Sequence, residues 1–464
     1  MNHLSEETVA AILKRGRIYE VGGAVRDRLL SGSKATKDCD YLVTGVGYDE
    51  LSRLLKQHGR VDLVGRSFGV IKYTQFTGGR GHTFDLTLPR REHSTGWGHK
   101  EFAVSFDPSL PVEEDLVRRD FTVNAMAVAL DNNELIDPLN GRMDLDNRQL
   151  RMVYPTSFED DPLRMLRAVQ FAARFGFMIE PETFRAIRKN AALIETVSAE
   201  RIAEELNKLL TLAQIPSSGF RLMQTLGLLK VILPELQTCV GVDQPGGYHK
   251  YDVFEHTMHI IDSCDARLRL RMAALFHDVT KPQARRLVDG GATFYGHEGT
   301  GAKVAASVLR RLRYSNGFIK QVATLVERHM FTTEVTPKGL RRLVRRVGVD
   351  LIHDLLDLRR ADVVAQGMGG TTEDVDQFET DIREELERKP PLSVTDLAID
   401  GRVMMELFQL EPGPAIGRVL SYLLERVLDD PNLNSREILT TLAREQIEQK
   451  ETLSDKNNLK ERDK

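Results

Sequence analysis

The chain has 464 residues, too many for a single hydrophobic core, so two to four domains are expected. Its 64 Lys and Arg residues against 68 Asp and Glu residues give a net charge of −4, so overall charge gives no sign of nucleic-acid binding, and local arginine pairs would have to provide it. Three widely separated cysteines without a Cys-x-x-Cys pair support neither a zinc site of that type nor a disulfide framework. With no signal peptide and no apolar run of membrane-spanning length, a cytoplasmic protein is expected.

A glycine turn and two nearby aspartates mark the first forty residues. Gly22 and Gly23 precede a predicted helix, where bare backbone N–H groups can approach phosphates. Asp38 and Asp40 lie two apart on a predicted strand, so their carboxylates should point to one face, with Cys39 on the other. Two hard oxygen ligands on a strand suit Mg²⁺ carrying a bound triphosphate.

The first 140 residues mix predicted strands and helices. Residue preferences predict strands over 61–64, 70–74 and 83–88, with a glycine-rich turn joining the last two. Residues 89–113 contain glycines and prolines and show little periodicity, which predicts a mobile loop.

Helices dominate the rest of the chain. A 3.6-residue apolar rhythm predicts a helix over 158–175 that stops at Gly176, and further helices are predicted over 199–212 and 220–229. Residues 241–247 are glycine-rich, which predicts a linker to another helical unit.

Two arginines precede an apolar run in the middle of the first half. Guanidinium groups such as those of Arg118 and Arg119 suit phosphate. A ribose hydroxyl could use Asp120 or Asn124 just after them. The plain structural alternative is a capped helix with an N-terminal aspartate.

A second charged segment opens the helix predicted over 158–175. Asp161, Arg164 and Arg167 are three residues apart and share one helix face, and Pro162 suits the first turn. A surface ion-pair ladder is the alternative interpretation.

Taken in order, these segments resemble the bacterial tRNA nucleotidyltransferases, namely the class II CCA-adding enzymes and the related poly(A) polymerases. The resemblance covers residues 18 to about 235. It rests on five motifs at compatible spacing: Gly22-Gly23-x-x-Arg26-Asp27, Asp38-x-Asp40, Arg118-Arg119-Asp120-Phe121-Thr122-x-Asn124-Ala125, Asp160-Asp161-x-x-Arg164-x-x-Arg167 and Glu200-Arg201-Ile202. It implies an α/β head of the polymerase-β-like nucleotidyltransferase type, followed by all-α neck, body and tail domains.

The resemblance also implies a role for each matching residue. Asp38 and Asp40 would be catalytic and bind Mg²⁺, and Asp85, on a later strand, would be a third catalytic acid. The nucleotide would be contacted by residues drawn from the motifs: Gly22, Gly23, Arg26, Arg119, Asp120, Asn124, Asp161, Arg164 and Arg167.

Base choice follows from hydrogen-bond patterns. Cytosine and adenine both offer an amino donor beside a ring-nitrogen acceptor, so Asp161 could accept from the first and Arg164 donate to the second. Uracil and guanine present the opposite arrangement and would leave both side chains unpaired. Two positions depart from the family's usual pattern, with Asp160 where glutamate is common and Gln170 where arginine is frequent.

A second set of metal-ligating residues lies in the middle of the chain. The order His256, His277-Asp278 and Asp362 resembles the HD phosphohydrolase superfamily, whose four ligands hold a divalent cation inside a helical bundle. His297 and His329 could add ligands for a second metal.

This second resemblance implies Mg²⁺, Mn²⁺ or Ni²⁺ and a water activated for phosphate-ester hydrolysis. His259 competes with His256 as the first ligand, and Thr280 stands where glycine is usual. An inactive HD domain with a purely structural role is the alternative.

Four domains are therefore expected: a nucleotidyltransferase head (1–140), a helical neck and body for base selection and RNA binding (141–245), an HD domain (246–370) and a helical tail with a disordered end (371–464). The predicted function is template-independent addition of CCA to tRNA 3′ ends from CTP and ATP, by a monomer or homodimer. The HD domain would hydrolyse phosphate esters on nucleotides or RNA ends.

Several other functions stay open at this point. The chain could add only CC or only A, or could be a poly(A) polymerase. It could also be a metal phosphohydrolase whose head is an inactive RNA-docking module, or a non-catalytic chaperone that binds tRNA.

Overall fold

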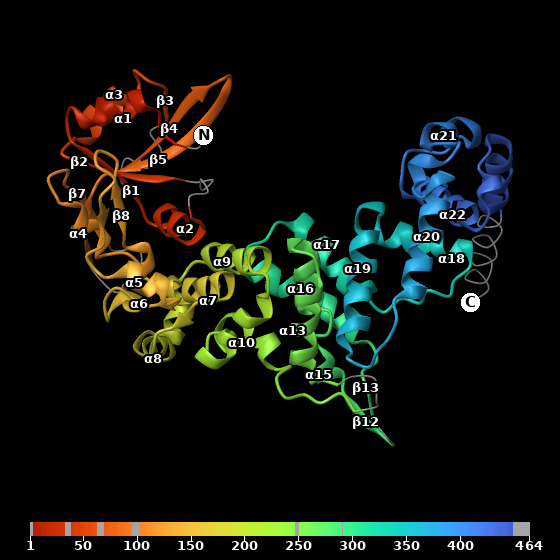
Figure 1. Cartoon of the computed structure of the whole chain (residues 1–464). Coiled ribbons are helices and arrows are strands. Elements are labelled where there is room, and N and C mark those ends of the chain that lie inside the picture. Colours follow the sequence, from red (N-terminus) through yellow and green to blue (C-terminus); the bar gives the residue numbers. More distant parts are fainter. Residues whose placement is uncertain are drawn as a thin grey trace, which may run out of the picture. The chain divides into compact units, whose positions relative to one another are not determined.

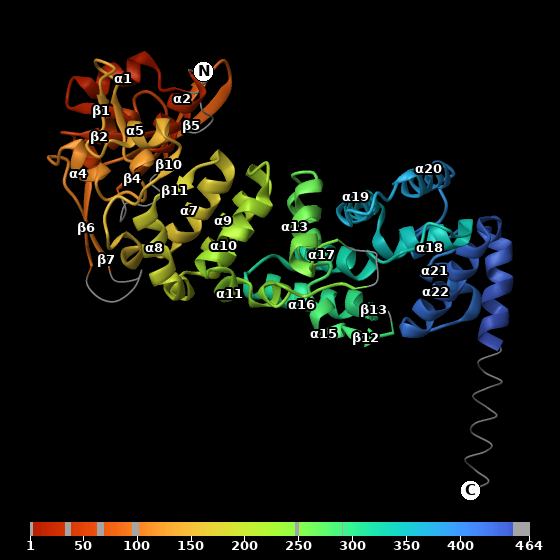
Figure 2. The same ribbon diagram turned by 60° about the horizontal axis from the view of Figure 1, so that its bottom comes forward.

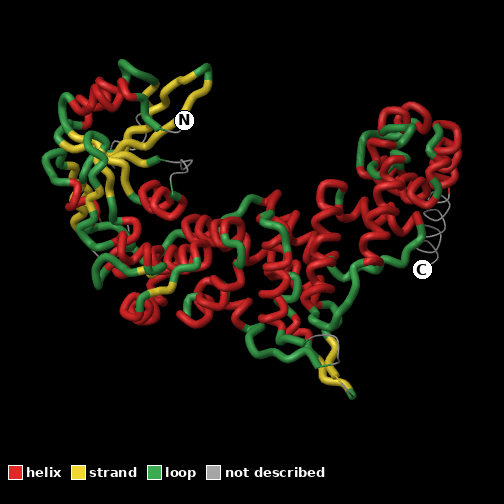
Figure 3. The backbone as a smooth tube through the Cα atoms, in the orientation of Figure 1, coloured by secondary structure: helices red, strands yellow, loops and turns green. Residues whose placement is uncertain are grey.

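The structure is a computed structural model that describes residues 3–32, 39–62, 69–94, 102–245, 250–289 and 291–448. The chain forms two compact units. Unit 1 comprises Met1–Thr238 and Val308–Tyr314, and unit 2 comprises Cys239–Ser307 and Ser315–Lys464. Strands gather in the N-terminal part of unit 1, and helices make up nearly all the rest of the described chain (Figures 1 and 3).

The head of unit 1 is built on a mixed seven-stranded sheet in the order β3-β4-β5-β2-β1-β8-β9. Its strands are β1 (Arg17–Val21), β2 (Asp40–Thr44), β3 (Arg60–Asp62), β4 (Val70–Thr77), β5 (Arg80–Thr87), β8 (Ala127–Ala129) and β9 (Leu135–Ile136). Strands β1 and β2 are antiparallel, whereas β2 and β5 are parallel. The α/β head expected from the sequence is therefore confirmed.

Helices pack against this sheet. They are α1 (Glu6–Leu13), α2 (Gly23–Ser31) and α3 (Tyr48–Leu55). Ile12 of α1 and Leu51 of α3 join Tyr41, Tyr73 and other strand residues in a fully buried core. Burying side chains of this size stabilises the sheet by about 2 kcal/mol each, and this fixes the strand ends that carry the candidate site.

The hairpin between β4 and β5 matches the strands predicted over 70–74 and 83–88. Gly78 and Gly79 form its turn with φ of +57° and +77°, a backbone conformation that favours glycine.

The prediction of an unstructured loop over 89–113 is wrong for its described part. Residues there form the antiparallel strands β6 (Arg90–Ser94) and β7 (Phe102–Phe106) and the short helix α4 (Val112–Leu116). The two strands pair with each other, and this pairing supplies a stability that local periodicity does not reveal. Residues 95–101 lie outside the described residues.

The remainder of unit 1 is helical, as predicted. Its helices are α5 (Gly141–Asp146), α6 (Ser157–Asp160), α7 (Leu163–Phe175), α8 (Pro181–Asn190), α9 (Ala199–Leu212), α10 (Pro216–Leu226), α11 (Leu229–Ile232) and α12 (Pro234–Gln237), with a small sheet of β10 (Gln149–Leu150) and β11 (Met178–Ile179). Helix α7 stops at Gly176, where φ is +69°, and packs on α9 and α10 (Figure 2). Helix α10 starts earlier than predicted because Pro216 opens it, and Gly227 ends it.

Unit 2 is also mainly helical, with one β-hairpin. Its elements are α13 (Val253–Ser263), α14 (Leu268–Phe276), α15 (Lys281–Ala284), β12 (Arg286–Val288), β13 (Gly291–Thr293), α16 (His297–Arg311, whose last four residues belong to unit 1), α17 (Asn316–Arg328), α18 (Pro337–Val347), α19 (Val349–Ala365), α20 (Glu373–Glu387), α21 (Gly401–Phe408) and α22 (Pro414–Asp429). The predicted disordered end, from residue 450, lies outside the described residues. Within the described ranges, no helix is long and apolar enough to cross a membrane.

Candidate functional site

The head site begins at the turn between β1 and α2. Gly22 has a φ of +70°, which favours glycine. A Cβ at this position would lie 2.4 Å from Nη1 of Arg119, so the arginine packs directly over the turn. Gly23 is the first residue of α2, and the N–H groups of a helix start attract anions. The turn thus combines a helix terminus with a guanidinium group, a pairing that suits phosphate.

Acidic residues of two neighbouring strands lie beside this turn. Asp40 is the exposed first residue of β2 and is paired with Val21, the residue before the glycine turn. On its other side it is the register partner of Asp85 on β5, so both carboxylates share one face of the sheet. Cys39, 3% exposed, points into the other face, as predicted.

A lysine that the sequence did not single out joins these acids. Lys72 on β4 is the register partner of Asp85, and its Nζ lies 3.6 Å from Asp85 Oδ1. The ammonium offsets part of the negative charge at the strand edge. Asp38, the predicted partner of Asp40, lies outside the described residues, so its contribution stays a prediction.

Four of the predicted nucleotide-binding residues form one hydrogen-bonded chain. Arg26 Nη1 donates to Asn124 Oδ1 at 2.6 Å, and Asn124 Nδ2 donates to Asp120 Oδ1 at 3.0 Å. Arg167 Nη2 lies 2.7 Å from the other oxygen of Asp120. Burial alone would raise the pKa of Asp120, but the charge of Arg167 and the hydrogen bond from Asn124 lower it below its usual value. The ionised Asp120 therefore fixes both neighbours.

A buried carboxylate holds the two consecutive arginines. Asp115 is fully buried, and Arg119 Nη2 lies 3.0 Å from its Oδ2, while Arg118 donates to its Oδ1. Burial alone would raise the pKa of Asp115, but the two guanidinium groups lower it. Asp115 thereby holds Arg119 in its position over Gly22.

The predicted base reader Asp161 already has partners on both carboxylate oxygens. Its Oδ1 accepts from the backbone N–H of Leu163 at 3.0 Å, and its Oδ2 accepts from Arg201 Nη2 at 2.8 Å. Arg201 belongs to the last of the five sequence motifs but had no predicted role. These bonds fix the orientation of the carboxylate, which as an acceptor can take more than one donor.

The second predicted base reader, Arg164, is held by groups on one side. Its Nη1 donates to Tyr154 Oη at 2.8 Å and to Ser157 Oγ at 2.9 Å. Its Nη2 donates to the backbone carbonyl of Arg118 at 2.8 Å. Arg164 and Arg167 lie on consecutive turns of α7, whereas Asp161 is an extended residue between α6 and α7. The single helix predicted over 158–175 is therefore interrupted before Pro162, and Asp161 does not share a helix face with the two arginines.

The histidines and aspartates predicted from the middle of the chain converge in unit 2. His256 Nε2 on α13 lies 3.0 Å from Asp362 Oδ1 on α19 and 3.7 Å from Asp278 Oδ2. His277 Nε2, at the end of α14, lies 3.0 Å from the same oxygen of Asp278. All four side chains are buried.

The two additional histidines join through the other oxygen of Asp278. His297 Nε2 lies 3.2 Å and His329 Nε2 lies 3.8 Å from Asp278 Oδ1, and the two nitrogens are 3.3 Å apart. The six predicted ligands therefore form one cluster with Asp278 at its centre. His259, the competing ligand, instead stacks on Tyr251 with ring centroids 4.2 Å apart.

Backbone hydrogen bonds fix the orientation of three of these histidines. His277, His297 and His329 each place Nδ1 2.7 Å from the carbonyl oxygen three residues earlier. A carbonyl only accepts, so Nδ1 carries a proton in each ring and Nε2 is the nitrogen that faces Asp278. Burial lowers the pKa of His329 to about 3, so its ring is neutral at neutral pH.

This donor set fits a divalent cation. His277 Nε2 is buried and faces Asp278 Oδ2 at 3.0 Å, so a ring nitrogen and a carboxylate oxygen that can both bind an ion lie side by side. Burial would lower the pKa of His277, but the charge of Asp278 raises it, so this nitrogen attracts either a proton or a metal ion. Imidazole nitrogens and carboxylate oxygens that face one another at 3.0–3.8 Å are the ligands that such ions accept.

The cluster lines an open pocket of about 530 Å³ in unit 2. Lys281 Nζ lies 2.7 Å from Asp278 Oδ2, and Arg359 Nη1 lies 3.2 Å from Asp362 Oδ2. Tyr295, 87% exposed, also lines the pocket. Sequence reasoning missed Lys281, although its position three residues after Asp278 was a readable signal. Metal ligands, two cations and an aromatic ring suit a phosphate ester.

Known families match three stretches of the chain. Residues 18–151 match the Poly A polymerase head domain, residues 176–239 match the RNA and SrmB-binding site of polymerase A, and residues 294–443 match tRNA nucleotidyltransferase domain 2.

Curated relatives carry three related names. The A-adding tRNA nucleotidyltransferase of Deinococcus radiodurans is 37% identical over 69% of this chain and 76% of its own length. The Multifunctional CCA protein of Dechloromonas aromatica is 39% identical, covering 68% and 73%. The CC-adding tRNA nucleotidyltransferase of Thermus thermophilus is 34% identical over 88% of both chains.

A solved structure shares the fold over nearly the whole length. The CCA-adding enzyme of Bacillus stearothermophilus, solved in complex with CTP, superposes with a TM-score of 0.68 at 22% identity, covering 96% of this chain and 98% of that one. Together with the relatives above, this agreement shows that the chain belongs to the tRNA nucleotidyltransferase family.

Proposed function

We propose that the head of this protein adds the nucleotides C, C and A to the 3′ end of tRNA, with CTP and ATP as substrates. The observation that carries the proposal is the register of Asp40 with Asp85 beside the Gly22 turn. It brings two carboxylates to the same strand edge as an anion-binding helix start. The names of the relatives, which span A addition, CC addition and CCA addition, support tRNA as the acceptor.

The strand-edge acids have the chemistry to hold Mg²⁺. Asp40 and Asp85, with Asp38 as a predicted third ligand, offer hard oxygen atoms on one face of the sheet. Bound Mg²⁺ would supply charge neutralisation at the α-phosphate and at the leaving pyrophosphate.

The remaining residues would bind and orient the nucleotide. Arg119, held over Gly22 by Asp115, would contact the triphosphate. Asn124 and Asp120, fixed by Arg26 and Arg167, would contact the ribose. Because these side chains are already held in place before the nucleotide binds, less conformational entropy is lost on binding.

Base selection would depend on Asp161 and Arg164. The bonds of Arg201 to Asp161 and of Tyr154 to Arg164 hold the two side chains in fixed rotamers. Cytosine and adenine can then pair with both, whereas uracil and guanine leave a buried donor or acceptor unsatisfied, which rejects them.

The decisive experiment is nucleotide incorporation into a tRNA that lacks its terminal CCA, with Mg²⁺ and CTP alone, ATP alone, or both. We expect two residues from CTP and a third when ATP is added. A stop after CC, or addition of A only to a CC-ended tRNA, would assign a partial enzyme. Long A tails would assign a poly(A) polymerase, and no incorporation would refute the proposal.

We further propose that the histidine cluster of unit 2 is a second, metal-dependent site that hydrolyses phosphate esters. The carrying observation is the convergence of four histidines on Asp278 and Asp362, beside a pocket that also presents Lys281 and Arg359. Mg²⁺, Mn²⁺ or Ni²⁺ bound by His256, His277, Asp278 and Asp362, with His297 and His329 as further ligands, would supply an activated water. The two cations would hold the phosphate.

Hydrolysis of p-nitrophenyl phosphate and of a 2′,3′-cyclic nucleotide, measured with each of the three metals, tests this second site. Activity that disappears in Asp362→Asn but persists in Asp40→Asn would support it. If both variants keep the activity, or if no metal confers any, the cluster has a structural role only.

A further inference from the structure

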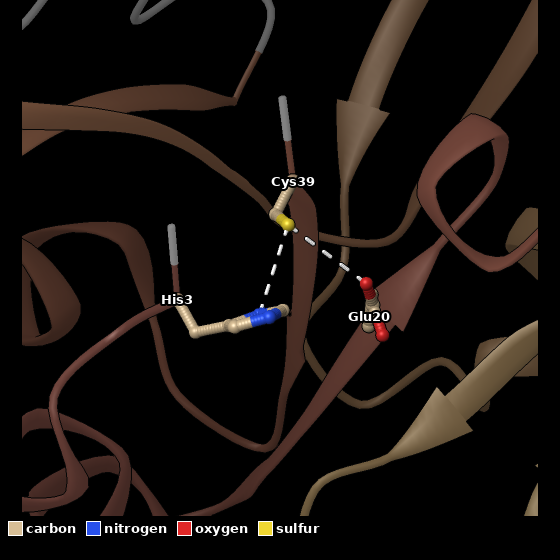
Figure 4. Close-up of side chains that lie close together, drawn as sticks. All are labelled: His3, Glu20 and Cys39. Atoms are coloured by element: carbon tan, nitrogen blue, oxygen red, sulfur yellow. Dashed lines mark hydrogen bonds between the residues drawn. The ribbon is translucent and has the colours of Figure 1, made fainter. Parts of the chain in front are cut away.

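A second group of metal-binding side chains lies in the head, on the sheet face away from Asp40. His3 precedes α1, Glu20 lies on β1 and Cys39 immediately precedes β2 (Figure 4). Cys39 Sγ lies 3.8 Å from His3 Nδ1 and 3.8 Å from Glu20 Oε1. One ligand atom from each residue falls within 4.8 Å of the others.

The sheet and the N-terminal segment hold these three residues in place. Glu20 and Cys39 are 2% and 3% exposed. Arg28 Nη1 lies 2.7 Å from Glu20 Oε2, which leaves Oε1 turned toward the sulfur. Gln75 Nε2 donates to the carbonyl of His3 at 3.0 Å and so ties the segment to β4. The three donors are therefore positioned by the fold of the head.

The two separations from Cys39 Sγ are close to the edges of a metal coordination tetrahedron. With usual bond lengths to sulfur and nitrogen, two ligands of a tetrahedral Zn²⁺ lie about 3.6 Å apart. A thiolate and a carboxylate bring two negative charges to the site, and although Arg28 compensates part of the Glu20 charge, they lower the cost of placing a dication there. Sulfur and imidazole nitrogen favour borderline ions over Mg²⁺, so this donor set differs in selectivity from the oxygen ligands of Asp40 and Asp85.

We propose that His3, Glu20 and Cys39 form a binding site for a borderline divalent metal ion of the Zn²⁺ class, with water as the fourth ligand. Binding would displace the thiol proton that Cys39 shares with Glu20. The ion would join the segment before α1 to β1 and β2. Cys39 directly precedes Asp40, so the ion would also fix the strand end that carries the catalytic carboxylate.

Cobalt substitution in the full-length protein tests the site, because a thiolate bound to Co²⁺ gives a charge-transfer band that the sulfur-free ligands of unit 2 cannot produce. We expect this band in the unmodified protein and its loss in Cys39→Ser. Cys239→Ser and Cys264→Ser are the matched controls, since both cysteines are also buried thiols and should leave the band intact.

His3→Ala keeps the test valid if Cys39→Ser fails to fold, because the His3 side chain is exposed. It should weaken Zn²⁺ binding, measured by competition with Co²⁺, by about 10–100-fold or more. The proposal is overturned if the unmodified protein shows no thiolate band, if the band survives Cys39→Ser, or if His3→Ala binds Zn²⁺ as tightly as the unmodified protein.

Discussion

The two candidate sites place their acidic ligands in opposite surroundings. In the head, Asp40 is exposed at the start of β2 and Asp85 is half-buried beside Lys72. In unit 2, Asp278 and Asp362 are buried among histidines, Lys281 and Arg359. One site offers its carboxylates to solvent, and the other surrounds them with groups that compensate their charge.

This difference has an electrostatic cause. Burial would raise the pKa of Asp278, but His277 and Lys281 hold it well below its usual range. An exposed carboxylate needs no such neighbours, because water solvates it, and it can bind and release a metal–nucleotide complex in every cycle. In the proposed function, the buried cluster would retain its ion, whereas the head would receive Mg²⁺ with each triphosphate.

The largest expected effect is the separation of the two activities. Asp40→Asn should lower nucleotide incorporation by about 1000-fold, because it removes a charge that stabilises the transition state. Phosphate-ester hydrolysis should stay within about twofold of the unmodified protein, since Asp40 lies in the other compact unit. Incorporation assays on a tRNA lacking CCA check the first expectation. Equal losses in both assays would contradict the separation.

Substitution of the central aspartate in unit 2 tests whether that cluster retains a metal ion. Asp278→Asn should lower the rate of phosphate-ester hydrolysis by about 100-fold and should lower the metal content after gel filtration by a similar factor. Asp278 contacts His256 and His277 through one oxygen and His297 and His329 through the other. Elemental analysis of the filtered protein measures the metal. If Asp278→Asn retained a full equivalent of metal, the remaining ligands would be enough to hold the ion without Asp278. Incorporation at saturating Mg²⁺ should not change and serves as the control.

The head also contains a buried acid, but one that binds arginines. Asp115→Asn should lower the free energy of unfolding by about 3 kcal/mol at pH 7, because Arg118 and Arg119 lose their buried counter-charge. Since the folded-state pKa of Asp115 is lowered, this stabilisation is present above the usual aspartate pKa of about 3.9 and is lost as the pH falls below it.

Urea unfolding at pH 7 and at low pH measures this difference. Asp131→Asn is the control, because Asp131 forms an exposed pair with Arg17, whose loss should cost less than about 0.5 kcal/mol. A difference between Asp115→Asn and the unmodified protein that stays constant down to low pH would contradict the assignment.

The smallest expected effect concerns the glycine turn. Gly22→Ala should raise the KM for CTP about tenfold, because the new Cβ displaces the Arg119 guanidinium from the phosphate site. Gly79→Ala has a similar positive φ but no atom within 4 Å of the new Cβ, so it controls for backbone strain. Steady-state kinetics of both variants check this. A similar KM in the two would assign the effect to strain alone.

Local sequence signals predicted much of the fold. Helix α9 has the predicted bounds and α7 stops at Gly176 as predicted, because apolar periodicity and a left-handed glycine act within a few residues. Strands β6 and β7 were missed because their pairing, such as Arg90 with Phe106, links residues with no local pattern.

The candidate sites also divide into features with a local sequence signal, which were predicted, and contacts between distant elements, which were not. The family resemblances located Asp40 and the histidine cluster, because short motifs such as Asp38-x-Asp40 and His277-Asp278 are recognisable in sequence even where the other ligands are distant. The contacts of Arg201 with Asp161 and of Lys72 with Asp85 depend on how distant elements pair, and the sequence alone does not indicate that pairing. The grouping of His3, Glu20 and Cys39 likewise arises from the register of β1 and β2.

The histidine side chains of unit 2 also terminate helices. His277 and His329 are the residues that follow the last turns of α14 and α17, and each donates to a carbonyl in that turn. A helix end leaves such carbonyls without partners in the backbone. These two histidines would therefore stabilise the helix ends whether or not the cluster hydrolyses phosphate esters. In a relative without the proposed hydrolysis, we would expect substitutions of Asp362 or Arg359 before substitutions of these two histidines, because only the histidines also stabilise helix ends.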